Sequence, residues 1–313
     1  MNAVFRTQSL TKKFGRTVAL AGIDVEVPEG AIYALVGANG AGKTTLIKVL
    51  MNIFQPTSGL ATVLGIDSRH IAGRHFERIG YVSENQEMPE WMTLRQLLDY
   101  YRNLYPAWDT ALEQQLVRQF DLPLNRKLKH MSRGMKMKAA FASSLPYRPA
   151  LIVLDEPFSG LDPLVRDELI EVLLDRAPET TIFLSSHDLA EIEAFSSHVG
   201  YLENGRLLFS EEMTSLAARF REITITLAEP LAQQFSPPAH WLQCESVDRV
   251  LRFVDSGYQE AASREELAAV FPGARDIAIQ PMSLRAIFLA VAKAGRTQPT
   301  STSVAAETRE VQI

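Results

Sequence analysis

One stretch of the chain reads Gly37-Ala38-Asn39-Gly40-Ala41-Gly42-Lys43-Thr44, which fills every fixed position of the pattern G-x-x-x-x-G-K-[ST]. An apolar run at residues 31–36 precedes it and predicts a buried strand, and residues 45–50 predict the start of a helix. This strand–loop–helix order is typical of a phosphate-binding loop, because a helix N-terminus carries partial positive charge. We expect Lys43 to reach the β- and γ-phosphates of a nucleotide and the Thr44 hydroxyl to help hold Mg²⁺. The alternative is a glycine-rich turn that binds nothing.

The composition describes an ordinary folded chain. Its 313 residues are enough for one large domain and one small domain, and 46% hydrophobic with 22% charged residues are typical globular values. The net charge of −5 gives no support for nucleic-acid binding. The single cysteine, Cys244, excludes an internal disulfide and a cysteine-based zinc cluster.

The sequence contains no apolar run of the ~18 residues that a transmembrane helix needs. Residues 1–8 lack the charged and apolar regions of a signal peptide. We therefore expect a cytoplasmic chain whose role at a membrane, if it has one, comes through a partner.

The first 30 residues predict antiparallel strands. Residues 5–10 and 22–27 alternate apolar and polar positions, as half-buried strands do. Phe14 lies between them and is a candidate to stack on a nucleobase. The alternative is a core phenylalanine beside a turn, and the spacing does not decide between the two.

Residues 92–129 predict helices, with Thr93 as an N-cap. Large aromatic side chains gather around their start: Trp91, Tyr100, Tyr101, Tyr105 and Trp108. They indicate either an exposed contact surface for another protein or the core of the helices, and both interpretations stay open. A loop of small residues at 131–135 precedes a further predicted helix at 136–145, and by itself indicates no more than a helix cap.

Two further strands end in residues suited to nucleotide chemistry. Residues 151–154 predict a strand buried on both faces, which ends in Asp155 and Glu156. Asp155 can hold the hydration shell of Mg²⁺, and Glu156 can polarise an attacking water; the alternative is a surface turn. Residues 180–184 predict another strand, followed by Ser185, Ser186 and His187. We expect His187 to donate a hydrogen bond to a γ-phosphate oxygen, since ligands bind at the carboxyl ends of such strands.

Together these elements resemble the nucleotide-binding subunit of ABC transporters over about residues 3–210. The resemblance comprises, in the family's order, the loop at 37–44, a signature-like loop at 131–135, Asp155-Glu156, Ser159-Gly160-Leu161-Asp162 and His187. It implies an α/β fold of the P-loop NTPase, ABC-type ATPase class: a RecA-like core, an antiparallel β subdomain and a helical subdomain. It also implies ATP and Mg²⁺ as cofactors.

The resemblance assigns roles residue by residue. It implies that Phe14, where tyrosine is more usual, stacks on adenine. Asp155 would organise Mg²⁺ together with Thr44, Glu156 would be the catalytic base, and His187 would sense the γ-phosphate. The phosphates would be held by Gly37, Asn39, Gly40, Ala41, Gly42, Lys43, Thr44 and Thr45.

Family members work as head-to-tail pairs, in which each ATP lies between the P-loop of one subunit and the signature loop of the other. The resemblance implies that Ser132 and Gly134 contact the γ-phosphate of the partner's nucleotide and that Asp162 lies in the loop that crosses the dimer interface. The working dimer is a homodimer or a heterodimer. Closing and opening of this sandwich would do mechanical work on an integral membrane permease, which would dock near residues 84–108.

Two elements of the chain depart from the family pattern. The signature is usually Leu-Ser-Gly-Gly-Gln, whereas residues 131–135 read Met-Ser-Arg-Gly-Met. Arg133 would either add positive charge near phosphate or point to solvent. Glu84 stands where a glutamine usually contacts Mg²⁺ and the attacking water. A carboxylate can bind the metal but cannot donate to the water, so Glu84 is a candidate metal and catalytic residue. Both departures bear on the hydrolysis rate more than on nucleotide binding.

The rest of the chain lies outside the ATPase core. We assign residues 1–212 to the ATP-binding domain, 213–295 to a small α+β domain, and 296–313 to a tail expected to be disordered. The predicted strands of the small domain are 223–227, 249–254 and 274–279, and its predicted helices are 265–271 and 283–294. Residues 281–289 resemble the C-terminal segment of exporter-type ATPases.

The leading hypothesis is therefore an ATPase subunit, peripheral to the cytoplasmic face of the membrane, that powers a separate permease. The export of a drug, peptide, lipid or polymer fits best. One alternative is an ABC-type ATPase of translation or DNA repair without a membrane partner. Another is a catalytically weak regulatory subunit.

Overall fold

The computed structural model describes residues 3–230 and 235–297. The chain divides into two compact units, Met1–Leu216 and Ala217–Ile313, here named unit 1 and unit 2. The sequence predicts a domain boundary after residue 212. This boundary stays a prediction and differs from the division after Leu216. Of the predicted tail, residues 298–313 lie outside the described part of the chain, whereas the two residues before them belong to α9 (Leu284–Thr297).

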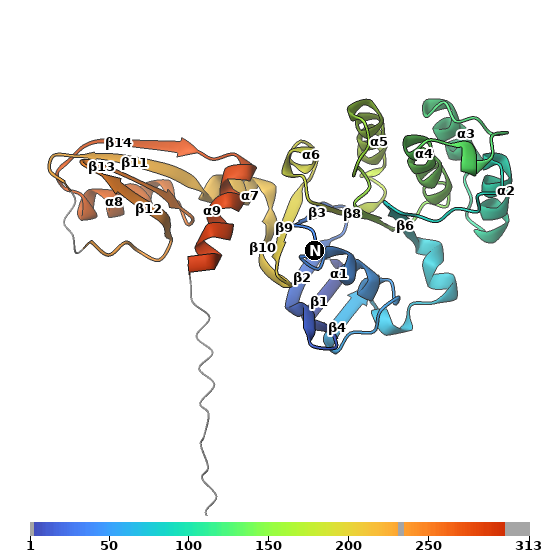
Figure 1. Cartoon of the computed structure of the whole chain (residues 1–313), viewed down its shortest axis with the longest axis horizontal. Coiled ribbons are helices and arrows are strands. Elements are labelled where there is room, and N and C mark those ends of the chain that lie inside the picture. Colours follow the sequence, from blue (N-terminus) through green and yellow to red (C-terminus); the bar gives the residue numbers. More distant parts are fainter. Residues whose placement is uncertain (1–2, 231–234, 298–313) are drawn as a thin grey trace, which may run out of the picture. The chain divides into compact units, whose positions relative to one another are not determined.

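A six-stranded sheet forms the middle of unit 1, in the order β10-β9-β3-β8-β7-β6 (Figure 1). Its strands are β3 (Ile32–Val36), β6 (Ile79–Ser83), β7 (Leu151–Asp155), β8 (Thr181–Ser186), β9 (His198–Glu203) and β10 (Arg206–Glu212). β9, β3, β8, β7 and β6 run parallel, and β10 is antiparallel to β9. Every residue of β3, β7 and β8 is buried, as expected for parallel strands covered on both faces.

Helices cover both faces of this sheet. Figure 1 shows α4 (Arg133–Ser144), α5 (Pro163–Arg176) and α6 (Leu189–Glu193) above it and α1 (Lys43–Leu50) below it. The helix predicted at 136–145 begins three residues earlier, because the Ser132 side chain accepts a hydrogen bond from the Met135 backbone and caps α4. Arg133 and Gly134 thus belong to the first turn of a helix rather than to a loop.

A second sheet of unit 1 is antiparallel, in the order β2-β1-β4-β5. It consists of β1 (Ala3–Phe14), β2 (Thr17–Pro28), β4 (Ser58–Val63) and β5 (Ile66–Asp67). The apolar face of β1 and β2 packs on the central sheet, and the ring centroids of Phe5 and Phe183 lie 4.7 Å apart. The 3₁₀ helices η1 (Ser68–His70) and η2 (Gly73–Arg78) lead from this sheet to β6.

The predicted helical region at 92–129 forms α2 (Leu94–Leu104), α3 (Thr110–Gln119) and the short 3₁₀ helix η3 (Leu128–His130). Thr93 caps α2 and forms a capping box with Gln96, so the predicted N-cap is confirmed. The sequence left two interpretations open for the aromatic residues here, an exposed contact surface or the core of the helices, and different residues fit each. Trp91 is 67% and Tyr100 56% exposed, whereas Tyr105 stacks on Tyr147 at 3.9 Å between ring centroids.

Unit 2 is the small α+β domain that the sequence predicts. Its antiparallel sheet has the order β12-β13-β11-β14, and α7 (Met213–Arg219) leads into it. The other elements are β11 (Arg221–Leu227), β12 (Trp241–Val247), β13 (Val250–Asp255), α8 (Glu260–Val270), β14 (Ala274–Pro281) and α9. Ile223, Trp241, Phe253 and Leu267 form part of its own hydrophobic core.

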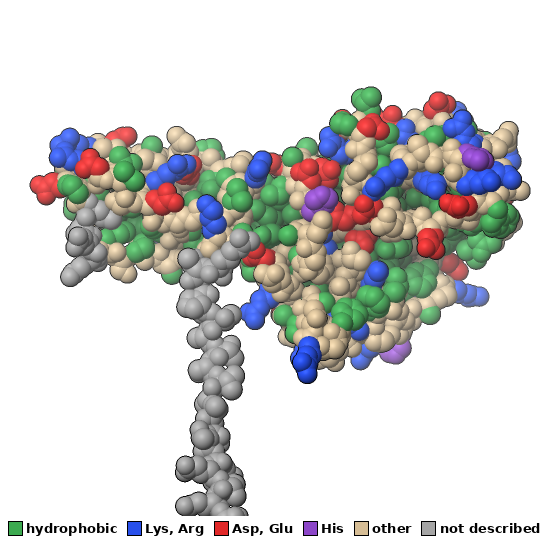
Figure 2. Space-filling model, in the orientation of Figure 1, with side chains coloured by type: hydrophobic (Ala, Val, Ile, Leu, Met, Phe, Trp, Pro, Cys, Tyr) green, Lys and Arg blue, Asp and Glu red, His purple; other side chains and the backbone are tan. Residues whose placement is uncertain are grey.

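The fold class predicted from the sequence is confirmed: a P-loop α/β core, an antiparallel subdomain, a helical subdomain and a small α+β appendage. Within the described residues, no helix is both long and apolar enough to cross a membrane. Figure 2 shows acidic and basic side chains interspersed over the visible surface, with hydrophobic side chains gathered at the end of unit 1 where Figure 1 labels α2.

Candidate active site

Neighbouring parallel strands of unit 1 bring the predicted site residues to one edge of the central sheet. In register, Asp155 of β7 lies beside Ser185 of β8, and Val36 of β3 lies beside Ser186 of β8. The loop at 37–44 therefore begins next to the polar residues that end β7 and β8. Such carboxyl ends are where open α/β sheets bind ligands.

Glycines give the loop at 37–44 its shape. Gly42 has φ = 113°, and a Cβ there would lie 2.6 Å from the carbonyl oxygen of Ala19. A Cβ at Gly37 would lie 2.2 Å from the carbonyl oxygen of Leu202. Neither position can carry a side chain without moving backbone atoms, so the loop packs directly on the neighbouring chain. It is a cradle of backbone that suits a phosphate group.

The tip of this loop faces solvent, and its end leads into α1. Asn39 and Gly40 are exposed, Ala41 is buried and Thr45 is half-buried. Gly40 has φ = 83°, and a Cβ at this position would meet no atom within 4 Å, so the glycine serves the turn rather than close packing. The N-terminus of α1 lies at the loop's end and adds partial positive charge there.

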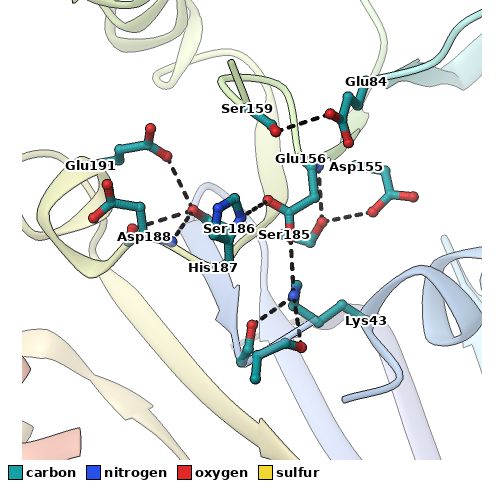
Figure 3. Close-up of polar contacts among 12 residues, drawn as sticks. Lys43, Glu84, Asp155, Glu156, Ser159, Ser185, Ser186, His187, Asp188 and Glu191 are labelled. Carbon is teal, nitrogen blue, oxygen red and sulfur yellow. Dashed lines mark hydrogen bonds and ion pairs between the residues drawn. The ribbon is translucent and has the colours of Figure 1, made fainter. Parts of the chain in front are cut away.

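Lys43 is 5% exposed and is held by groups of the site itself. Its Nζ donates to the carbonyl oxygens of Gly37 at 2.6 Å and Ala38 at 3.3 Å, and lies 3.0 Å from Oε1 of Glu156. The other carboxylate oxygen, Oε2, lies 2.8 Å from Nδ1 of His187 (Figure 3). Because a carboxylate can only accept, Nδ1 carries the proton of that bond. Lys43, Glu156 and His187 thus form one connected group.

Asp155 belongs to a second group at the same edge. Its Oδ1 accepts hydrogen bonds from the Thr44 hydroxyl at 3.0 Å and from the Ser185 hydroxyl at 2.7 Å. Ser185 Oγ in turn accepts from the Glu156 backbone N–H at 3.0 Å. That bond helps to hold Glu156 in the left-handed region, with φ = 52°, which is strained for a residue with a side chain. The sequence assigned no role to Ser185, although its position at a strand end could have suggested one.

The loop after β8 is braced by its own polar groups. The Ser186 hydroxyl lies 3.2 Å from Oε2 of Glu191, and it accepts from the Asp188 backbone N–H at 3.0 Å (Figure 3). Burial raises the pKa of Glu191 above its ordinary value, although the hydrogen bond from Ser186 opposes the change. This bracing fixes the backbone beside His187, whose side chain is 44% exposed.

Glu84 follows β6 and is engaged by protein donors. Its Oε1 accepts from Arg133 Nη2 at 2.6 Å and from the Ser159 hydroxyl at 2.9 Å. Burial favours a higher pKa for Glu84, but the bonds from Arg133 and Ser159 outweigh it, so the pKa lies below its ordinary value. Arg133 thus binds Glu84 while its side chain stays 47% exposed, and the two expectations for its role stay predictions.

The remaining predicted site residues lie farther along the surface. Phe14 is 44% exposed, so it is not a core residue, and its ring lies edge-on to Phe54 at 5.2 Å with Lys12 Nζ 4.9 Å from its centroid. Ser132 and Asp162 are exposed caps of α4 and α5. In the described part of the chain, no hydrogen bond or ion pair joins them to the loop at 37–44.

Gly134 is a site of close packing between helices. A Cβ at this position would lie 3.3 Å from Cγ2 of Val165 in α5, tighter than most real contacts. The first turn of α4 therefore lies against α5. Ser132, Gly134 and Asp162 are brought near one another by this packing, although their predicted contact with a partner's nucleotide stays a prediction.

Comparison with known proteins identifies the family. The family model described as "ABC transporter" matches residues 20–159. The bacitracin transport ATP-binding protein BcrA of Enterococcus faecalis is 31% identical over 228 residues, which are 72% of this chain and 74% of that protein. An uncharacterised ABC transporter ATP-binding protein of Nostoc is 35% identical over 211 residues, 64% of this chain and 62% of that protein.

A solved structure described as an ATP-binding subunit of an ABC transporter matches with a TM-score of 0.63 and 28% identity. The match covers 68% of this chain and 91% of that one. The chain therefore belongs to the ATP-binding proteins of ABC transporters, and it is an ATP-binding and ATP-hydrolysing protein. This membership supports the transporter hypothesis over an ATPase of translation or DNA repair.

Proposed function

We propose that this chain powers a separate integral membrane permease that exports a compound such as a drug or a peptide. Its likeness to BcrA, which is named as a bacitracin transport protein, supports this class of cargo. The exporter-like segment at 281–289 points in the same direction. The chain would be attached peripherally to the cytoplasmic face of the membrane, where ATP is supplied, and its net charge of −5 argues against nucleic acid as a partner.

We propose Glu156 as the catalytic base because of the two side chains that contact its carboxylate. Both carry donors that a phosphate group would attract. Lys43 lies against Oε1 and His187 against Oε2. The γ-phosphate of ATP carries more negative charge than one carboxylate, so both donors would turn to it. Glu156 would then be free to accept the proton of an attacking water as general base. Substrate binding would thus release the base at the moment it is needed.

The donor set also fits Mg²⁺. The Thr44 hydroxyl and the Asp155 carboxylate lie 3.0 Å apart at the loop's end, and hard oxygen donors of this kind suit the ion. Bound there, Mg²⁺ would neutralise charge on the phosphate oxygens. Thr44 and Asp155 would hold it through oxygen, and Ser185 would keep the Asp155 carboxylate oriented. Glu84 remains a sequence prediction as a metal or catalytic residue, since its carboxylate is engaged by Arg133 and Ser159 in this structure.

Phosphate binding would rest on the loop from Gly37 to Thr45, and adenine would stack on Phe14. The exposed ring of Phe14 supports that proposal, because a stacking platform needs an open face. Two chains would pair head to tail, so that Ser132, Gly134 and Asp162 complete the site of the other chain. Ser132 and Asp162, the caps of α4 and α5, are exposed and can therefore contact a second ATPase domain. That domain would belong to an identical chain or to a different one.

The permease would contact the helical subdomain near residues 84–108. A cavity of about 220 Å³ opens there, lined by Tyr81, Tyr101, Tyr105 and Tyr147 among others. Trp91, just before α2, and Tyr100, within α2, are exposed, and hydrophobic side chains gather at this end of unit 1 (Figure 2). Aromatic side chains that combine apolar area with a polar group are favoured at protein interfaces.

The direct test is recovery of the tagged chain from detergent-extracted membranes, with its ATPase rate measured beside that of the isolated chain. We expect a multi-span membrane protein to be recovered and to raise ATP turnover. Substitution of Trp91 by alanine should weaken this recovery while the ATPase rate of the isolated chain stays within about twofold, since Trp91 lies outside the nucleotide site. Recovery of ribosomes or DNA without a membrane protein would contradict the proposal.

A further inference from the structure

Two of the positions at which this chain departs from the family pattern, Glu84 and Arg133, touch each other. Arg133 Nη2 lies 2.6 Å from Glu84 Oε1, and the two residues are 49 positions apart in the sequence. Glu84 follows β6 of the central sheet, and Arg133 is the first residue of α4. Their bond therefore ties the beginning of α4 to the edge of the central sheet.

The guanidinium group of Arg133 also packs against a third part of the chain, the loop at Ser159 and Gly160. Gly160 has φ = 64°, and a Cβ there would lie only 2.9 Å from Arg133 Nη1. The preceding residue, Ser159, donates its hydroxyl to the same Glu84 oxygen at 2.9 Å. A side chain at Gly160 would displace Arg133, so the glycine makes room for the guanidinium as well as for the turn. Three segments thus meet at one carboxylate.

This cluster is joined by backbone bonds to the residues proposed for catalysis. The Glu84 N–H donates to the carbonyl oxygen of Asp155 at 2.9 Å, and the Ser159 N–H donates to that of Glu156 at 3.3 Å. A movement of α4 that pulls on Arg133 would therefore reach the backbone of both carboxylates. The path consists of a few direct contacts rather than a general deformation of the fold.

We propose that Glu84 and Arg133 act as one clasp, a pair of positioning residues that hold the first turn of α4 against the loop after Glu156. In this role Glu84 serves Arg133 rather than a metal ion. The departures at Glu84 and Arg133 are then a single matched change. The clasp sets how firmly the N-terminus of α4 is held on the core, and it does so within one chain, whether or not a permease or a second ATPase domain is bound.

The exposure of the clasp suits a contact that opens and closes. The side chain of Glu84 is 31% and that of Arg133 47% exposed. Half-exposed ion pairs stabilise proteins only modestly, because water and salt screen them. The bond from Ser159 and the packing on Gly160 add to the pair, so the clasp favours one position of α4 without locking it.

The test is a double-mutant cycle on the full chain with Glu84→Ala, Arg133→Ala and the double variant. The first readout is amide hydrogen exchange of residues 133–137 without nucleotide. We expect each single variant to raise the exchange rate by about threefold to tenfold and the double variant to raise it no further, because either change opens the same contact. The charge-reversed pair, Glu84→Arg with Arg133→Glu, should recover part of the protection.

A second readout separates positioning from metal binding. Both single variants should lower kcat for ATP by a similar factor while KM stays within about twofold, because the loop at 37–44 is untouched. The matched control is Lys136→Gln. Lys136 pairs with Glu90 at 3.7 Å within the helical subdomain, so its loss should leave exchange and turnover unchanged.

The proposal is overturned if the effects of the two single variants on exchange add, or if exchange does not change. It is also overturned if Glu84→Ala raises the Mg²⁺ concentration needed for half-maximal turnover while Arg133→Ala does not. In that case Glu84 acts on the metal independently of Arg133.

Discussion

Two buried aspartates at the ends of strands show how differently the two units use the same residue type. Asp255 ends β13 in the antiparallel sheet of unit 2 and is fully buried. Its oxygens accept from the Gly257 backbone N–H at 2.9 Å and from the Ser263 hydroxyl at 3.1 Å. Asp155 ends β7 in the parallel sheet of unit 1, and both of its hydroxyl donors, Thr44 and Ser185, lie on the other segments of the site.

The difference follows from strand direction. In an antiparallel sheet, neighbouring strands end at opposite edges, so a polar residue at one end meets chiefly the segment that follows its own strand. In a parallel sheet all carboxyl ends share an edge, and the loops after several strands converge. Asp255 therefore binds only the segment that follows its own strand, the turn at Gly257 and α8, whereas Asp155 and Glu156 are part of a shared site. In the described residues, Oε1 of Glu156 has the charge of Lys43 beside it but no well-aligned hydrogen bond.

The largest effect is expected from Lys43→Ala. Loss of a buried, charge-assisted donor should weaken ATP binding by about 30-fold or more and abolish measurable turnover. Isothermal titration with a non-hydrolysable ATP analogue measures the binding. Lys48→Ala, on the same helix but over the Phe54 ring, should change affinity by no more than about twofold. If Lys43→Ala bound nucleotide normally, the phosphate-binding role of the loop would be wrong.

The next effect is expected from Glu156→Gln. The amide keeps the shape of the side chain but cannot accept the proton of water, so turnover should fall by about 10²- to 10⁴-fold. ATP binding should persist, and size-exclusion chromatography with ATP and Mg²⁺ should show an accumulating dimer. Glu191→Gln, in α6, is the control and should leave turnover within several-fold. A Glu156→Gln chain that stays monomeric under these conditions would count against the head-to-tail sandwich.

Much of this site could be predicted from the sequence, because its parts are local. The loop at 37–44 and the strand ending in Asp155 and Glu156 each carry a complete signal within about ten residues. A parallel arrangement of buried strands then places their ends together, as the structure shows for β3, β7 and β8. The fold class could be predicted for the same reason.

Contacts between distant segments could not be predicted in this way. Nothing near Arg133 in the sequence indicates Glu84, because only the packing of α4 on the core brings the two together. The sequence of strand β12 also lacks the regular alternation of apolar and polar residues that would predict a strand. Gln243 has φ = 53°, and the pairing with β13 shifts between Leu242 and Glu245, so the alternation that marks a strand is interrupted.

A smaller effect on turnover is expected from Ser185→Ala. The change removes a donor to Asp155 and the acceptor of the Glu156 N–H, which should cost about 1–3 kcal/mol and lower turnover about tenfold. Steady-state ATPase assays and urea unfolding measure the two effects. Ser143→Ala is the matched control, because Ser143 is equally buried but bonds only within α4 in the described contacts. Equal turnover in both variants would show that Ser185 does not orient the carboxylates.

The smallest effect on turnover is expected from Trp241→Ala, although its effect on stability is large. Trp241 is 4% exposed and stacks on Phe253 at 4.2 Å between ring centroids, so its loss leaves a cavity in the core of unit 2. The free energy of unfolding of unit 2 should fall by about 3–5 kcal/mol. Near-ultraviolet circular dichroism during urea unfolding measures this change. ATP turnover at low temperature should stay within about twofold, because the proposed catalytic groups lie on unit 1. Val247→Ala, at a site 75% exposed, should change neither property. A fall in turnover as large as that of Ser185→Ala would mean that unit 2 supports the chemistry directly, and the contrast between the two sheets would no longer explain where the site lies.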